Sequence, residues 1–278
     1  MTPSVAMSPR ITGGTRLLGF IGDPVIHARS PQNFNPRIAA AGQNAVLVPM
    51  HLLPDDFDAA IDALMTIANL DGLVVTMPFK ERIIPKLGEI STRARAVGAV
   101  NAAKRTSEGR WVGDIFDGVG LLGAVKSLGV DPRGYAVGLI GAGGAGAAIA
   151  FALAEAGVDS LAITDQQSDR AARLAERVGD IGSLKPVAGN FDLHGLDLLI
   201  NATPVGMSPG DGIAIDVERL SGRTVVVDIV TKPSTPLLEE AARRGCRHVG
   251  GAAMVAAQTD AMLRFFDLGN CGSVSGDS

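Results

Sequence analysis

Short apolar runs alternate with amphipathic or alanine-rich stretches along most of this 278-residue chain. The runs end at glycine, proline or acidic residues, which is typical of buried strands. Residues 54–67 carry Phe57, Ile61, Leu64 and Ile67 at helical spacing, which predicts an amphipathic helix. Strands that alternate with helices indicate an α/β protein. The predicted strands are 17–22, 45–49, 72–76, 99–103, 111–112, 134–140, 161–165, 196–201, 223–230 and 248–249, and the predicted helices are 54–67, 121–128, 147–156, 235–244, 252–266 and one that starts at Ser30 as N-cap with Pro31 in its first turn.

One predicted strand ends in a glycine-rich turn that leads into a helix. Gly141, Gly143 and Gly146 form the pattern G-x-G-x-x-G between strand 134–140 and helix 147–156. This order is the context in which the pattern binds the pyrophosphate of a dinucleotide, at the amide groups that open the helix. Asp165 follows about twenty residues later, at the end of the next strand, where a carboxylate accepts hydrogen bonds from the ribose hydroxyls of the adenosine half. An aspartate that only shapes the turn or caps the next helix is the alternative.

The domain organisation follows from the chain length and from a second glycine cluster. A chain of 278 residues is long for one hydrophobic core. Residues 113–120 are rich in glycine, and we place the crossing between domains there. The prediction is an α/β fold with two domains, a Rossmann-like dinucleotide-binding domain over 118–251 and a smaller α/β substrate domain over 1–117 that the C-terminal helix in 252–278 completes.

Composition excludes several classes of partner. Aromatic residues make up 4% of the chain and the net charge is -4, so there are few side chains to stack on nucleic-acid bases and no basic footprint for nucleic acid. No apolar run reaches membrane-spanning length and residues 1–15 lack a signal-peptide pattern, so we expect a cytoplasmic protein without a membrane partner. Cys246 and Cys271 lie far apart and the four histidines are scattered, so we expect reduced thiols and no metal site. Either a monomer or a homodimer fits the sequence.

Polar residues stand at the ends of several predicted elements, and each has an ordinary explanation when taken alone. Ser30 could be only a helix cap, Lys80 a solvated lysine and Asp117 a turn residue. Taken together and in order, however, the motifs around them resemble those of the shikimate dehydrogenase family from Gly22 to Gln258. The motifs are GDPV at 22–25 with SP at 30–31, VTMPFK at 75–80, GAVN at 98–101, DGVG at 117–120, the glycine loop, NATPVGM at 201–207 and residues 251–258.

This resemblance implies a set of site residues and a reaction. Lys80 and Asp117 are expected to be the catalytic pair, and the hydroxylated ring carboxylate is expected to bind Ser30, Thr76, Asn101 and Gln258. Hydride transfer needs a group that takes the hydroxyl proton in oxidation and returns it in ketone reduction. A carboxylate beside a lysine favours the charged lysine, which is the acid. We therefore expect ketone reduction near neutral pH and faster oxidation as the pH rises.

The substrate side departs from the family pattern. The usual H-S-x-S-P has Ala28 at its first serine, the asparagine of N-V-T is Val74, and N-T-D-G is replaced by Ile115-Phe116-Asp117-Gly118. The tyrosine expected after residues 228–230 is Thr231. Arg29 could restore an anion contact or point into solvent. Because unpaired polar groups discriminate strongly between substrates, shikimate, quinate and modified analogues all stay open.

The cofactor prediction is NAD rather than NADP. Family members that use NADP usually carry Asn-Arg-Thr where this chain has Asp165-Gln166-Gln167, and a carboxylate there repels a 2′-phosphate. Arg170 on the next helix could soften this preference. The resemblance also implies that the loop 142–145 holds the pyrophosphate and that Thr203 and Pro204 border the adenosine side. By the same resemblance, Ile229, Gly251 and Met254 are expected around the nicotinamide. The expected cofactor-binding residues are Ala142, Gly143, Gly144, Ala145, Asp165, Gln166, Thr203, Pro204, Ile229, Gly251 and Met254.

Two other functions compete with an NAD-dependent oxidoreductase. The missing substrate-binding groups would suit a dinucleotide-binding regulatory or sensor protein with little turnover, although such a protein needs no Lys80–Asp117 pair. A related dehydrogenase that acts on another small molecule, such as a folate, has no support in the substrate-side motifs.

Overall fold

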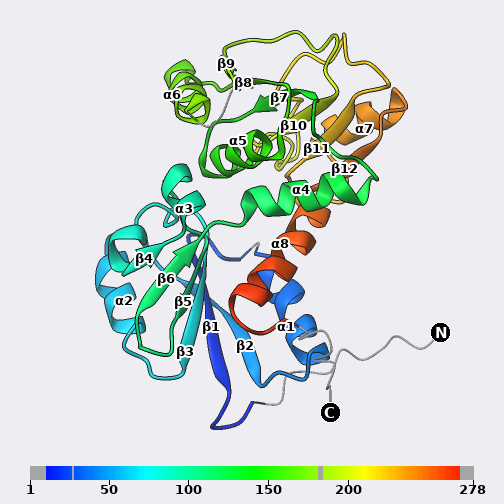
Figure 1. Cartoon of the computed structure of the whole chain (residues 1–278). Coiled ribbons are helices and arrows are strands. Elements are labelled where there is room, and N and C mark those ends of the chain that lie inside the picture. Colours follow the sequence, from blue (N-terminus) through cyan, green and yellow to red (C-terminus); the bar gives the residue numbers. More distant parts are fainter. Residues whose placement is uncertain (1–10, 27, 181–183, 270–278) are drawn as a thin grey trace, which may run out of the picture. The chain divides into compact units, whose positions relative to one another are not determined.

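The structure is a computed structural model that describes residues 11–26, 28–180 and 184–269. It divides into two units, one made of the described residues up to Ile115 and from Thr259 onward, the other of Phe116–Gln258. Each unit contains a six-stranded sheet with helices, so the predicted α/β fold with two domains is confirmed (Figure 1). No helix among these residues has the length and apolar character needed to cross a membrane.

The sheet of the first unit has the order β2-β1-β3-β5-β6-β4. Strands β1, β2 and β3 are parallel, whereas β5 runs antiparallel to both β3 and β6. The carboxyl ends of β1, β2, β3 and β6 therefore share one edge with the amino end of β5. The strands are β1 (Arg16–Gly22), β2 (Ala45–His51), β3 (Leu70–Val75), β4 (Glu89–Ile90), β5 (Ala102–Arg105) and β6 (Trp111–Asp114).

Helices of this unit pack on the sheet through aromatic side chains. Phe34 of α1 (Ser30–Ala40) lies 6.5 Å from Phe266, measured between ring centroids. Phe266 covers Gly72 so closely that a Cβ there would lie 2.6 Å from its ring, so no side chain fits at this position. Phe57, at the start of α2 (Phe57–Leu64), stacks on Phe79 at 4.4 Å. The remaining helices are the short 3-10 helices η1 (Pro54–Asp56) and η2 (Ile84–Lys86), and α3 (Thr92–Val97).

Two helix predictions in this unit are wrong in detail. The helix predicted over 54–67 is the 3-10 helix η1 followed directly by α2, and it ends at Leu64, so that Ile67 is 39% exposed beyond its end. The hydroxyl of Thr66 donates to the carbonyl of Ala63, and the guanidinium of Arg105 donates to the carbonyls of Met65 and Ile67. Side chains thus bind carbonyl groups that the backbone amides of a longer helix would otherwise bind. Ser30 is the first residue of α1 rather than its N-cap, because Arg29 holds the cap position without a side-chain hydrogen bond.

The second unit contains a fully parallel sheet of order β12-β11-β10-β7-β8-β9. Its strands read as buried apolar runs, as parallel strands covered on both faces do. The strands are β7 (Ala136–Ile140), β8 (Ser160–Thr164), β9 (Val187–Ala188), β10 (Leu198–Asn201), β11 (Val225–Asp228) and β12 (His248–Gly250), and the helices are α4 (Asp117–Ser127), α5 (Gly144–Ala156), α6 (Ser168–Gly179), α7 (Pro236–Arg243) and α8 (Gly251–Phe265), whose last residues belong to the first unit.

Helix α4 begins four residues before the helix predicted over 121–128 and includes Gly118 and Gly120 from the segment 113–120, where the crossing between domains is predicted. A Cβ at Gly118 would lie 2.5 Å from the carbonyl oxygen of Ala148 on α5, and one at Gly120 would lie 2.8 Å from the carbonyl oxygen of Met254 on α8. These glycines therefore let α4 pack closely against two helices.

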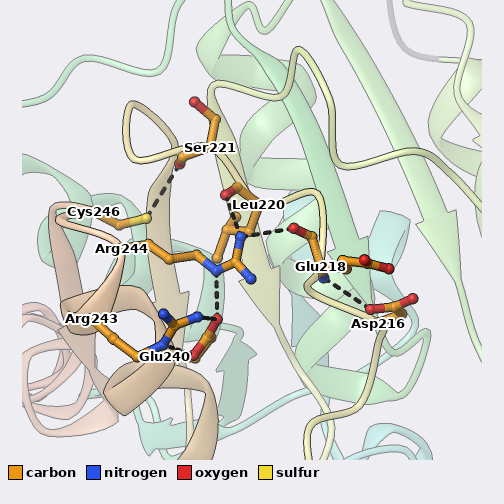
Figure 2. Close-up of polar contacts among 8 residues, drawn as sticks. All are labelled: Asp216, Glu218, Leu220, Ser221, Glu240, Arg243, Arg244 and Cys246. Carbon is orange, nitrogen blue, oxygen red and sulfur yellow. Dashed lines mark hydrogen bonds and ion pairs between the residues drawn. The ribbon is translucent and has the colours of Figure 1, made fainter.

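Helix α7 and the loop over 216–221 cover one face of this sheet, and an ion-pair cluster joins them (Figure 2). Glu240 accepts hydrogen bonds from Arg243 and Arg244, which lower the pKa of its carboxyl to about 2. Arg244 also donates through Nη1 to the carbonyls of Glu218 at 2.8 Å and Leu220 at 3.1 Å. Cys246, whose thiol donates to the carbonyl of Ser221, is free, and burial raises its pKa. Cys271 lies outside the described residues.

Candidate active site

The predicted residues of the first unit lie at one edge of its sheet. Thr76 directly follows β3, and its amide donates to the carbonyl of Ile21 near the end of β1. A Cβ at Gly22 would lie 2.3 Å from the Thr76 methyl group, so glycine is required for this close approach. Ser30 opens α1, which follows β1, and its side chain is half-buried. The substrate-side motifs at 22–31 and 75–80 are thus adjacent in the fold.

Backbone hydrogen bonds of Asn101 and Lys80 tie three segments of this edge together. The Asn101 carbonyl accepts from the Val75 amide at 2.9 Å, and the Asn101 amide donates to the carbonyl of Asp114 at 3.0 Å. The Lys80 carbonyl accepts from the Val100 amide at 2.8 Å. Lys80 is therefore hydrogen-bonded to the residue that directly precedes Asn101. The Asn101 side chain is buried, whereas that of Lys80 is half-buried.

Asp114 anchors the end of the strand that leads to Asp117. Arg93 makes a bidentate ion pair with its carboxylate, and Ser91 donates to the same group. The carboxylate also accepts from the Ile115 amide at 2.8 Å. This set of bonds fixes the point from which the chain leaves β6, and sequence reasoning missed it because Asp114 matches no motif.

Asp117 and Gln258 are brought together within the second unit. Asp117 opens α4 and is 5% exposed. The side-chain amide of Gln258, on α8, donates to Oδ1 of Asp117 at 3.1 Å. Met254 and Gln258 both face Gly120 of α4, so the expected common helix face is observed. Lys80 belongs to the first unit and Asp117 to the second, so the arrangement of the units sets the distance between the members of the predicted pair.

The glycine loop fits a pyrophosphate. Gly141 has φ 101°, which favours glycine, and a Cβ at Gly146 would lie 2.0 Å from the Gly141 carbonyl oxygen. Nothing lies within 4 Å of the Cβ position of Gly144, so the space in front of the loop is open there. The first amides of α5 have no acceptor inside the helix and suit an anion. The residues present therefore fit a dinucleotide.

Asp165 holds the glycine loop in place. Its Oδ2 accepts from the Ala142 amide at 2.7 Å, and its Oδ1 accepts from the Gln167 amide at 2.9 Å. Both carboxylate oxygens thus shape the two loops after β7 and β8, which is the turn role weighed as the alternative from sequence. Each oxygen has further lone pairs, so this bonding is compatible with a ribose contact. Arg170 lies close by, since a Cβ at Gly143 would be 3.4 Å from its Nη2.

The remaining predicted cofactor residues follow the other parallel strands. Thr203 and Pro204 follow β10, Ile229 follows β11, and Gly251 follows β12 at the start of α8. A Cβ at Gly251 would lie 2.1 Å from the Ile229 carbonyl oxygen, so these two positions are in direct contact. All of them lie at the carboxyl edge of the sheet, where ligands of such sheets bind.

A cavity of about 540 Å³ opens beside the end of β8, and sequence reasoning gave no sign of it. Its rim carries an ion pair of 2.6 Å between Arg219 and Asp192. The lining combines apolar and polar side chains, namely Thr164, Asn190, Phe191, Asp192, Leu193, Ala214, Ile215, Asp216 and Arg219.

Comparisons with known proteins give consistent results. Residues 20–103 match the model of the shikimate dehydrogenase substrate binding domain. The chain is 40% identical to the shikimate dehydrogenase (NADP(+)) of Rubrobacter xylanophilus, over 90% of each chain. Its fold is similar to that of shikimate 5-dehydrogenase from Listeria monocytogenes in complex with shikimate and NAD, with a TM-score of 0.83, 30% identity and 94% of each chain covered.

A third relative is named for a different substrate. The quinate dehydrogenase of Corynebacterium glutamicum, in complex with NAD, is similar with a TM-score of 0.80 and 29% identity, covering 91% of this chain and 93% of that one. The resemblance inferred from the motifs is thereby confirmed. The chain belongs to the shikimate dehydrogenase family.

Proposed function

We propose that this protein is an NAD-preferring dehydrogenase that interconverts a shikimate-like or quinate-like ring carboxylate and its 3-dehydro ketone. Family membership supports an oxidoreductase that uses a nicotinamide dinucleotide, because the relatives are named for that chemistry. The single observation that carries the proposal is the hydrogen bond between Gln258 and Asp117, which joins a predicted substrate-binding residue to a predicted catalytic one. The same relatives give no support to a sensor with little turnover.

Lys80 and Asp117 are proposed to handle the proton. The bound nicotinamide supplies the hydride acceptor or donor, and the protein must supply the group that takes or returns the hydroxyl proton. Lys80 is the proposed acid and base, with Asp117 favouring its charged form. Gln258 orients Asp117, because its amide occupies one lone pair of Oδ1 and leaves Oδ2 for other partners.

The substrate is proposed to bind at the sheet edge of the first unit. Ser30, Thr76 and Asn101 all lie there and offer hydroxyl and amide groups, which suit a polyhydroxylated acid. Val74 and Phe116 are 4% and 5% exposed, so two positions that are polar in the family pattern carry buried apolar side chains here. These replacements favour a substrate with fewer polar contacts than shikimate makes in typical family members.

The NAD preference rests on Asp165 and Gln166. A carboxylate at this position repels a 2′-phosphate, and Gln166 carries no charge that would compensate. Arg170 lies beside the glycine loop, and its positive charge limits the preference. Relatives with either cofactor exist, since the Rubrobacter enzyme is named for NADP(+) and the Listeria and Corynebacterium structures contain NAD. The cavity lined by Thr164, the residue before Asp165, is the proposed space for the adenosine half of the cofactor.

One assay tests the proposal. The absorbance of the reduced nicotinamide is followed at alkaline pH with NAD or NADP against shikimate, quinate and their amino analogues. Turnover of a ring carboxylate with a higher kcat/KM for NAD is the expected result. Tight binding of NAD without turnover of any of these acids would overturn the substrate assignment, and a higher kcat/KM for NADP would overturn the cofactor preference.

A further inference from the structure

A buried carboxylate joins the loops at the carboxyl ends of β10 and β11. Asp228 is the last residue of β11 and is fully buried. Its Oδ1 accepts from the Asn201 side-chain amide at 3.0 Å and from the Val230 amide at 3.1 Å. Its Oδ2 accepts from the Thr235 hydroxyl at 2.6 Å. Burial raises the pKa of this carboxyl, so retaining an acidic side chain here carries a cost.

The Asn201 side chain carries this connection into the loop after β10. Its Oδ1 accepts from both the amide of Thr203, at 3.0 Å, and the Thr203 hydroxyl, at 2.6 Å. Its Nδ2 donates to the Val205 carbonyl at 3.1 Å as well as to Asp228. The conformation of residues 203–205 is therefore set by one amide side chain that Asp228 holds.

A second connection runs from Asp228 to the start of α8. The Val230 amide bonds Asp228, and the Val230 carbonyl accepts from the Gly251 amide at 3.2 Å. The Ile229 amide donates to the Asn201 carbonyl at 3.1 Å, which closes the ring of contacts. Thr203, Ile229 and Gly251, three of the positions at the carboxyl edge of this sheet, are thus linked through one buried group.

We infer that Asp228 is a positioning residue for the nicotinamide dinucleotide, which it influences through Asn201 and Val230 without touching it. A purely structural role does not require a carboxylate, because an apolar side chain at the end of a buried strand costs less to bury. The carboxylate instead satisfies three donors from three separate segments at once, which no single neutral side chain does. This inference rests on the proposed function only in that the cofactor lies at this edge of the sheet.

The chain offers a matched pair of variants that separates positioning from stability. Thr235 and Thr224 are both almost fully buried, at 1% and 0% exposure. The Thr235 hydroxyl bonds Asp228 at the carboxyl end of β11, whereas the Thr224 hydroxyl bonds the Leu196 carbonyl at 2.9 Å at the amino end. The substitutions Thr235→Val and Thr224→Val each remove one buried hydroxyl, next to opposite ends of β11. The Thr235 hydroxyl also accepts from the Leu238 amide as the N-cap of α7, so the free energy of unfolding of both variants is measured beside their cofactor affinity.

The experiment measures NAD and NADP binding by titration calorimetry for the unmodified protein, Asp228→Asn, Thr235→Val and Thr224→Val. We expect Kd for the better cofactor to rise about tenfold in Asp228→Asn and about threefold in Thr235→Val, with a change below about twofold in Thr224→Val. In steady-state assays KM for the cofactor should rise more than KM for the ring acid. Hydrogen exchange without cofactor should be faster at the amides of Thr203 and Val230 in Asp228→Asn than in Thr224→Val.

The outcomes distinguish the two proposals. Unchanged cofactor affinity in both Asp228→Asn and Thr235→Val, in protein that is folded by circular dichroism, would overturn the positioning role alone. Equal weakening in Thr235→Val and Thr224→Val would also overturn it, because the effect would then follow stability. If Asp228→Asn does not fold, Thr235→Val and Thr224→Val decide the question. Absence of dinucleotide binding in the unmodified protein would overturn the proposed function and the positioning role with it.

Discussion

The side-chain amide of Gln258 donates a hydrogen bond to Oδ1 of the buried Asp117 at 3.1 Å. The two residues are 141 positions apart in the sequence, and close packing of α4 on α8 at Gly120 brings their helices together. Removing the amide leaves a buried carboxylate with one partner fewer. Hydrogen bonds to charged groups contribute about 1.5–3 kcal/mol, so Gln258→Leu is expected to lower kcat by about tenfold to a hundredfold. Steady-state kinetics check this, and an unchanged kcat would exclude Gln258 from the site.

The packing of α4 predicts a loss of stability in Gly120→Ala. The added Cβ would lie 2.8 Å from the Met254 carbonyl oxygen, and backbone cannot yield as a flexible side chain does. We expect the free energy of unfolding to fall by about 1–3 kcal/mol, as in other overpacked sites. Gly212→Ala is the control, since nothing lies within 4 Å of its Cβ position. Denaturant titration measures both variants, and equal stability of the two would contradict the packing argument.

Cofactor selectivity is expected to shift in the double variant Asp165→Asn with Gln166→Arg. The change removes the charge that repels a 2′-phosphate and adds a bidentate donor for it, so kcat/KM for NADP should rise by about tenfold or more. An asparagine has one acceptor oxygen, whereas Asp165 uses both of its oxygens on the amides of Ala142 and Gln167. The single variant Asp165→Asn is therefore expected to bind both cofactors more weakly. No gain for NADP in the double variant would refute this account of selectivity.

The stability of Asp228→Asn relative to the unmodified protein is expected to depend on pH. Burial raises the pKa of Asp228 above its ordinary value of 3.8, so the folded chain holds this proton more tightly than the unfolded chain. Asp228 therefore contributes most to stability below that value, and the contribution is lost as the pH rises through the folded pKa. Asparagine does not titrate, so the deficit of Asp228→Asn should shrink between pH 4 and pH 7. Denaturant titrations across that range measure it, and a deficit that grows with pH would contradict the assignment.

The sequence predicted those strands and turns that are encoded by a few consecutive residues. The buried runs of β7, β8, β10 and β11 and the glycine loop were visible because each burial pattern and turn is encoded within a few residues. The strands Glu89–Ile90 and Val187–Ala188 were not predicted, because two residues carry no periodicity and pairing partners alone define them. The end of α2 was missed for a similar reason, since Arg105 is 38 positions or more from the carbonyls that it binds there.

The sequence named candidate site residues but not the contacts between them. Ordered motifs pointed to Asp117, Gln258 and the glycine loop, whereas the bond between Asp117 and Gln258 needed the packing of two helices. Asp228 belongs to a predicted strand, but the sequence gives no sign of its three hydrogen bonds. The donors are at positions 201, 230 and 235, and the folded parallel sheet is needed to bring them to one carboxylate. The second role of Asp165, as the residue that holds the glycine loop, likewise appears only in three dimensions.

The most direct test of the account is the turnover of Lys80→Met, measured together with its cofactor affinity. Absorbance of the reduced nicotinamide gives kcat with the preferred ring acid, and calorimetry gives Kd for the cofactor. If Lys80 transfers the proton, kcat falls by about 10²–10⁴-fold while Kd stays within about twofold. An unchanged kcat would contradict the account, because it would remove Lys80 from the chemistry.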